Sequence, residues 1–138
     1  MDTQITIRDL SRPYKDGTPN LEIRVDKNIA IQIGFDPNGQ TPIDIDLFGN
    51  SLKGKIHLTY NCDFAWVSPI VFSSDGKENR IPYLLRDLRI TNKSKILAKI
   101  TKSKLKLGHK DVSSQVLDQS DLDLESYEYC RRQLVSSP

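Results

Sequence analysis

Alternation of apolar and polar residues at a period of two runs through most of the chain before residue 110. Residues 21–25 and 43–47 show it most clearly, with Leu, Ile and Val at odd positions and charged residues at even ones. Successive side chains of a strand point to opposite faces, so each run should have one buried and one solvated face. Turn-forming residues separate the runs, namely Asp36-Pro37-Asn38-Gly39, Gly49-Asn50 and Ser74-Asp75-Gly76-Lys77. The sequence therefore predicts a mainly β fold, an antiparallel β-sandwich or barrel with one or two short helices.

The same pattern places individual strands. We expect residues 21–25 and 29–33 to form a half-buried hairpin around Asp26-Lys27-Asn28, because both runs alternate. In the strand pair that follows, Asp44 and Asp46 should face solvent. The inward side chains predicted after the Gly49-Asn50 reversal are Ile56, Leu58 and Tyr60.

Two segments are less regular. Pro69 interrupts the apolar run 64–72 and should push it toward a sheet edge or a bulge, because proline cannot donate a ladder hydrogen bond. Residues 81–88 fit a helix with Pro82 in its first turn, and they also fit a strand. We favour the helix.

The length of 138 residues fits a single domain. We expect residues 1–110 to form a β-rich core that contains a basic region, 80–110, and residues 111–138 to form an acidic linker and a short C-terminal helix. No apolar run approaches the ~20 residues needed to span a bilayer, and the amino terminus lacks the layout of a secretory signal. A cytoplasmic, non-secreted protein is expected.

Charge is concentrated in the basic region. It holds ten Lys and Arg residues against the single acid Asp87, a net charge of +9 in a chain whose total is +2. Such a field favours polyanions, namely phosphate backbones or acidic lipid headgroups. The predicted polyanion-binding residues are Arg86, Arg89, Lys93, Lys95, Lys99, Lys102, Lys104 and Lys106.

The lysines of this region change phase. They occupy odd positions from Lys93 to Lys99 and even positions from Lys102 to Lys106, with the slip at residues 101–103. Because register fixes which face is wet, a turn or bulge is required there if both runs are to bury their apolar side chains. Six lysines could then share one face. Two explanations remain open: a polyanion-binding face, or a pair of edge strands that lysine guards against aggregation.

An aromatic segment, Phe64-Ala65-Trp66-Val67, suggests self-association. Clustered aromatic residues near a sheet edge are often buried against a partner, so we predict an oligomer interface formed by Phe64, Trp66 and Val67. Trp66 could equally be the core tryptophan of the monomer.

Catalysis is not expected. Asp44-Ile45-Asp46 resembles a metal-binding DxD sequence, but strand alternation places both carboxylates on a solvated face. His57 alternates outward and lacks any hydrolase or metalloprotease context. We predict no catalytic residue, no metal and no cofactor; a nuclease built from Asp44, Asp46 and Lys55 is a minor alternative.

One family resemblance can be read from the strands. Leu21-Glu22-Ile23, Ile43-Asp44-Ile45 leading into Gly49-Asn50-Ser51-Leu52, and Asp63-Phe64 follow one another as strands do in the small matrix proteins of bornaviruses. Lys53-Gly54 with Ile56, Leu58 and Thr59 is similar to a strand of rhabdovirus matrix proteins. The resemblance covers residues 20–72 and implies a β-sandwich that self-associates, binds the inner leaflet of an envelope and contacts nucleoprotein or RNA. Arg12-Pro13-Tyr14 departs from the PPxY budding motif of many matrix proteins.

We therefore expect a non-enzymatic, self-assembling structural protein that presents a basic face to an anionic membrane or to nucleic acid or nucleoprotein, as a viral matrix protein does. Its partners would be further copies of itself, a peripheral anionic membrane surface and RNA or nucleoprotein, with no small-molecule substrate. If viral, it would reside in the virion and at the inner membrane face of the host cytoplasm. The alternatives are an RNA- or single-strand-binding accessory module of barrel type and an enzyme or inhibitor of unknown target.

Overall fold

The computed structural model describes residues 1–108. Its elements in chain order are β1 (Asp2–Asp9), β2 (Leu21–Asp26), α1 (Lys27–Ile33), β3 (Gly39–Leu47), β4 (Asn50–Leu58), β5 (Phe64–Val67), β6 (Ile70–Ser73), β7 (Glu78–Arg80), α2 (Ile81–Asp87), β8 (Lys95–Ile100) and β9 (Lys104–Leu107). The linker and helix predicted for residues 111–138 lie outside the described residues.

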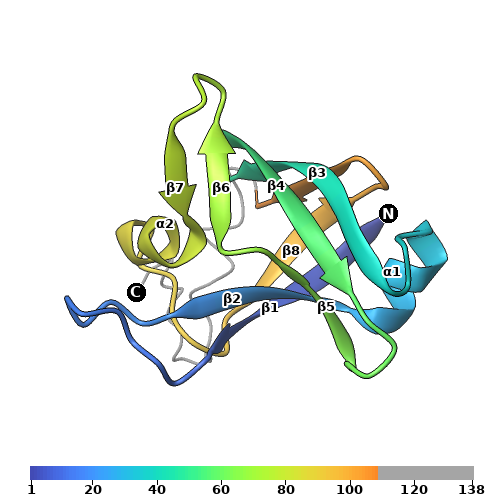
Figure 1. Cartoon of the computed structure of the whole chain (residues 1–138), viewed down its shortest axis with the longest axis horizontal. Coiled ribbons are helices and arrows are strands. Elements are labelled where there is room, and N and C mark those ends of the chain that lie inside the picture. The colour runs from blue at the N-terminus through green and yellow to red at the C-terminus, as the bar shows by residue number, and fades with distance from the viewer. Residues whose placement is uncertain (109–138) are drawn as a thin grey trace.

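Seven of the strands close into a barrel in the order β3-β9-β8-β1-β2-β5-β4, and β4 pairs with β3 to complete the ring (Figure 1). The β6–β7 hairpin continues from β4 and extends away from the barrel. Of the two predicted architectures, the barrel is therefore the one observed. All strand pairs of the barrel are antiparallel except one, because β3 and β9 run parallel.

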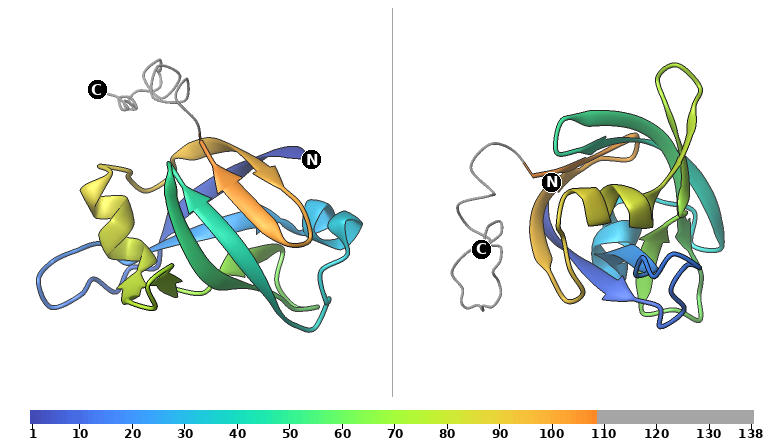
Figure 2. Two further views of the ribbon diagram at one scale, coloured as in Figure 1. Left: turned by 90° about the horizontal axis from the view of Figure 1, so that it is seen from above. Right: turned by 90° about the vertical axis from the view of Figure 1, so that its left-hand side faces the viewer.

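Alternating apolar side chains fill the barrel, as the period of two predicted. Ile5, Ile7, Ile23 and Ile45 are almost completely buried, and their neighbours along each strand face outward. The two short helices lie at opposite ends of the barrel, with α2 in front of the ring and α1 behind it in the right-hand view of Figure 2. Both add buried side chains to the apolar core of residues 1–108, among them Ala30 of α1 and Leu85 of α2.

The predicted hairpin of residues 21–25 and 29–33 is wrong, because residues 27–33 form α1. The Asp26 carboxylate accepts hydrogen bonds from the backbone N–H groups of Asn28 and Ile29, which caps the helix, and Gly34 ends it with φ of 102°. The apolar residues of this segment, Ile29, Ala30, Ile31 and Ile33, fit both periods. The caps at its two ends decided for the helix, and Ile31 is left 50% exposed.

The predicted reversal between β3 and β4 is confirmed as a two-residue turn. Leu47 pairs with Asn50, and Phe48 and Gly49 both have positive φ, as a type I′ turn requires. The inward orientation predicted for Ile56 and Leu58 is confirmed as well. Tyr60 lies beyond the end of β4 and is 67% exposed, so its predicted inward orientation is wrong.

The phase slip at residues 101–103 is confirmed as the turn of the β8–β9 hairpin. Ile96, Ala98 and Ile100 of β8 are buried together with Leu105 and Leu107 of β9. Both strands lie inside the barrel wall, β8 between β1 and β9, and β9 between β8 and β3. The explanation that their lysines guard free sheet edges is therefore wrong, because neither strand is an edge.

The helix favoured for residues 81–88 is confirmed as α2, which has Pro82 in its first turn. Pro69 lies between β5 and β6, outside both strands. Ile81 donates its backbone N–H to the carbonyl of Pro69, which joins the start of α2 to the start of β6.

Candidate polyanion-binding face

The lysines of the basic region gather on the outside of the barrel wall. Lys95 and Lys99 of β8, and Lys104 and Lys106 of β9, alternate with buried residues and are exposed. Lys93 precedes β8, Lys102 lies in the hairpin turn, and both are exposed. We call these six residues the lysine face. The structure therefore brings together four of the six predicted lysines on adjacent strands, and the other two are exposed beside the ends of β8.

Aspartates border the lysine face on both sides. Lys99 lies opposite Lys106, Asp2 of β1 lies opposite Lys99, and Asp46 of β3 lies opposite Lys106. Residues directly opposite in a ladder have neighbouring side chains, and like charges there repel. This row of four strands therefore carries two positive charges in its middle and one negative charge at each end.

A second row runs beside the first. Asp44 of β3 lies between Lys104 of β9 and Lys53 of β4, and the Lys53 ammonium approaches the Asp44 carboxylate to 2.9 Å. Both side chains of this ion pair are largely exposed, so it contributes little to stability. The lysine face and Lys53 together supply seven positive charges against three aspartates, so the surface stays strongly basic.

An apolar side chain lies within the lysine face. Leu97 of β8 points outward between Lys95 and Lys99 and is 42% exposed. This leucine adds nothing to the core of the barrel, and it places exposed apolar surface among the lysines.

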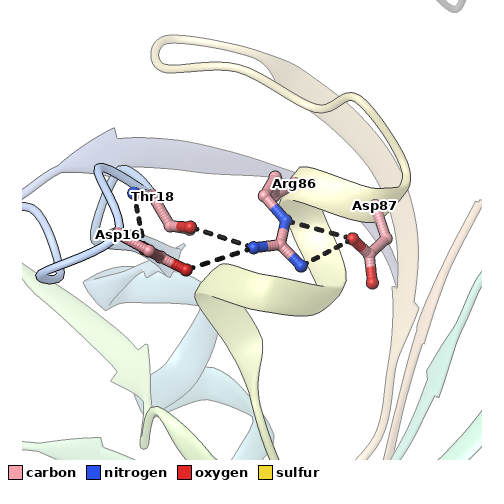
Figure 3. A network of polar contacts seen from close by, with 4 residues as sticks. All are labelled: Asp16, Thr18, Arg86 and Asp87. Carbon is pink, nitrogen blue, oxygen red and sulfur yellow. Dashed lines mark hydrogen bonds and ion pairs between the residues drawn. The ribbon is translucent and has the colours of Figure 1, made fainter.

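Arg86 does not belong to this face. Its guanidinium donates to the hydroxyl of Thr18 at 3.0 Å and to the carboxylate of Asp87 at 2.9 Å, and it lies 3.5 Å from the carboxylate of Asp16 (Figure 3). Tyr14 stacks on Tyr83 of α2 beside this network, with ring centroids 5.0 Å apart. Arg86 therefore fastens the β1–β2 loop to α2 and lies apart from the lysine face.

The same network lowers the pKa of an acidic group, the carboxyl of Asp16. Asp16 accepts the backbone N–H of Thr18 at 2.9 Å. Hydrogen bonds from Thr18, first from its backbone and then from its side chain, lower the pKa of the Asp16 carboxyl, and the charge of Arg86 adds to this shift. Arg89 follows α2 in a left-handed conformation with φ of 60°, on α2's end of the barrel and not on β8 or β9.

The DxD aspartates have structural partners. Asp44 pairs with Lys53, and the carboxylate of Asp46 accepts the backbone N–H of Gly49 at 2.7 Å, which supports the β3–β4 turn. Among residues 1–108, no group of three or more His, Cys, Asp and Glu side chains is placed to hold a metal ion.

The predicted interface residues point in two directions. Val67 is 1% exposed and belongs to the core, so its predicted role in an oligomer interface is wrong. Phe64 and Trp66 face outward and are half-buried. Trp66 is therefore not the core tryptophan of the monomer, which answers the alternative left open by the sequence.

Three strands build a cation–aromatic row around these two rings. Arg24 of β2 lies 3.9 Å from the centre of the Phe64 ring and is held by Glu22 at 2.8 Å. Trp66 of β5 stacks on His57 of β4, with ring centroids 5.2 Å apart. Strand alternation predicts that these side chains face outward. Only the strand order β2-β5-β4 makes them neighbours, and the sequence does not show that order.

The surroundings of His57 lower the pKa of its imidazole. The main cause of the lowered pKa is partial burial of the ring. The positive charge of Lys55 lowers the pKa further, and the negative charge of Glu22 opposes the shift. Nε2 of His57 and the Ser68 hydroxyl form a hydrogen bond. The predicted outward orientation of His57 is confirmed, and its ring supports one face of Trp66.

A shallow groove of about 600 Å³ lies beside this row, over the outer faces of β1 and β2. Arg8, Arg24 and Lys95 line it with positive charge, Asp26 and Asp63 add carboxylates, and Phe64 supplies an aromatic wall. Arg8 and Arg24 are far from the basic region in sequence, so charge counting along the chain did not find them.

Fold and surface together define a small closed β-barrel with a basic outer face. No family model, curated protein or solved structure matches this chain. Within residues 1–108, no helix has the length and apolar character that crossing a bilayer requires.

Proposed function

We propose that this protein is a non-enzymatic, self-assembling structural protein that lays its lysine face on an anionic membrane surface, as a viral matrix protein would. The observation that carries the proposal is the gathering of four exposed lysines on two adjacent strands that are not sheet edges, with Lys93 and Lys102 exposed beside the ends of β8. Protection against edge-to-edge pairing does not account for them, and each lysine near an anionic leaflet contributes about 1 kcal/mol to binding.

Leu97 favours a membrane over other polyanions. An exposed leucine among lysines gains free energy when it enters the apolar boundary below the headgroups, whereas a phosphate backbone offers it no comparable environment. The matrix class rests on the sequence resemblance in residues 20–72, a region that spans β2 to β6.

Vesicle binding tests this function. Replacing Lys95, Lys99 and Lys106 by Gln should weaken binding to phosphatidylserine vesicles and flatten its salt dependence, because fewer charges face the lipid. A matched control replaces Arg12, Lys15 and Lys77, which are exposed and lie outside the lysine face. It removes the same charge and should retain binding. Equal loss in both variants, or no loss in the first, contradicts the proposal.

A second candidate function is single-stranded RNA binding, favoured by the groove. Arg8, Arg24 and Lys95 could follow a phosphate backbone there, and Phe64 lies beside them as an apolar wall for a base. Arg24 already covers one face of Phe64, which limits stacking. This function requires that Arg8→Gln lower the affinity for a homopolymer RNA while Lys104→Gln does not. Tight RNA binding without vesicle binding would favour this candidate over the first.

A further inference from the structure

The β6–β7 hairpin carries an open strand edge. Among the strands that the structure describes, β7 is last in the sheet order and pairs on one side only, with β6. The hairpin extends away from the closed barrel, as Figure 1 shows. Open edges are the positions at which sheets add further strands.

The free backbone groups of β7 can be assigned. Ser73 donates its N–H to the carbonyl of Lys77, and Ile81 donates to the carbonyl of Pro69. Hydrogen-bonded pairs alternate with non-bonded pairs in an antiparallel ladder. Asn79, which lies between Lys77 and Ile81, therefore forms the next hydrogen-bonded pair, with Val71 of β6. The N–H groups of Glu78 and Arg80 therefore point away from β6, toward the open side.

The side chains on this edge are complementary to themselves. Glu78 and Arg80 stand two residues apart on one face, on either side of Asn79. Within the chain their charged groups approach only to 3.9 Å, and both side chains are well exposed. If a second β7 runs antiparallel with Asn79 opposite Asn79, Glu78 of each copy lies opposite Arg80 of the other.

We propose that β7 pairs antiparallel with β7 of a second copy of this chain about a two-fold axis at Asn79, which joins the two β6–β7 hairpins into one sheet. The inference deepens the self-assembly part of the proposed function and rests on it. Each Arg80 N–H donates to the Glu78 carbonyl of the other copy, and two Glu–Arg pairs form across the axis. The Arg80 carbonyl starts the hydrogen bonds of α2, so we count only these two backbone bonds.

Charges of one sign on an edge oppose its pairing with a second copy, because like charges opposite one another repel. Here the signs alternate across the axis and attract. Ile70 and Phe72 of β6 lie opposite Arg80 and Glu78 and remain exposed, so they flank the proposed charge pairs with apolar surface. The pairing closes at two copies, since each β7 has a single open edge.

Charge reversal tests the register. Alone, Glu78→Arg or Arg80→Glu places like charges opposite one another and should abolish the dimer. When the two variants are mixed in equal amounts, one copy carries two arginines at these positions and the other carries two glutamates. Both cross-axis pairs then join opposite charges, so the mixture should dimerise again. Sedimentation equilibrium over a concentration series gives the mass in each case, and circular dichroism confirms that each variant is folded.

The expected result is a concentration-dependent dimer for the unchanged protein and for the mixture, and monomers for each single variant. Arg12→Glu, an exposed reversal in the β1–β2 loop, is the matched control and should dimerise normally. A monomer at all accessible concentrations overturns the inference, as do single variants that dimerise normally. Dimer loss in Trp66→Ala alone would place the interface on the aromatic row instead. Vesicle binding by the folded single variants separates a failure of this inference from a failure of the proposed membrane function.

Discussion

Lys99 of β8 stands directly opposite Lys106 of β9 on the outside of the barrel. Asp2 lies opposite Lys99 on one side, and Asp46 lies opposite Lys106 on the other. Two lysines side by side repel, and the flanking aspartates offset this repulsion. The same aspartates reduce the attraction that the lysine face exerts on an approaching anion. They should therefore stabilise the fold and weaken the binding of anions.

Removing one flanking charge should separate these two effects. Asp2→Asn is expected to lower the free energy of unfolding by roughly 0.2–1 kcal/mol at low salt, because one attractive cross-strand pair is lost. The same change should tighten binding to phosphatidylserine vesicles by up to about 1 kcal/mol. Urea unfolding and vesicle co-sedimentation measure the two effects. Asp87→Asn makes the same charge change on α2, apart from the lysine face and in an exposed ion pair that contributes little to stability, and it should alter neither. A loss of vesicle affinity in Asp2→Asn would refute the prediction.

Arg86 should act on the β1–β2 loop and not on binding. In Arg86→Gln the loop loses its contacts with Asp16 and Thr18, so the backbone amides of Tyr14 and Thr18 should exchange with solvent faster. Hydrogen exchange measures this, and vesicle affinity should stay at the level of the unchanged protein. Arg89→Gln provides the control at the end of the same helix. Slow exchange retained in Arg86→Gln would show that the network does not hold the loop.

Gly108 should not tolerate a side chain. It has φ of 69°, and an added Cβ would overlap Cε1 and Cδ1 of the Phe48 ring. Gly108→Ala therefore combines left-handed strain with overpacking and should lower the free energy of unfolding by roughly 2–4 kcal/mol. Gly76→Ala is the matched control, because Gly76 has φ of 84° and open space around it. Urea unfolding compares them, and equal losses would mean that Phe48 moves aside.

The protein should become less stable as the pH is lowered, because His57 then takes up a proton. Its folded-state pKa lies below the ordinary 6.5, so the unfolded chain binds the proton first as pH decreases. Above pH 6.5 the imidazole is neutral in the folded and the unfolded state, so His57 no longer makes the stability depend on pH. The free energy of unfolding should decline as pH falls from 6.5 through the lowered pKa. His57→Gln should flatten this slope in pH-dependent urea unfolding, and an unchanged slope would assign the effect to other groups.

Local patterns determined much of this fold. Period-two alternation predicted the strands between residues 43 and 58, and the phase slip after Lys99 predicted the β8–β9 turn. These features depend on neighbours in sequence, since alternation follows from the geometry of an extended chain. The outward phase of the lysines follows from the same geometry. Where both periods fitted, as in residues 27–33, the alternation was misleading, and the capping residues Asp26 and Gly34 carried the correct signal.

Tertiary structure decided which strands became neighbours. The parallel seam between β3 and β9 joins segments about 60 residues apart and closes the barrel, and closure is what removes β8 and β9 from the sheet edge. The charge of Arg86 suggested a binding residue, but the fold places Asp16 and Thr18 beside it as structural partners. Arg24, Trp66 and His57 became one row only through strand order. Local sequence determines the face on which a side chain lies, whereas its partner across the sheet depends on long-range pairing, and that pairing is set by the burial of the whole core.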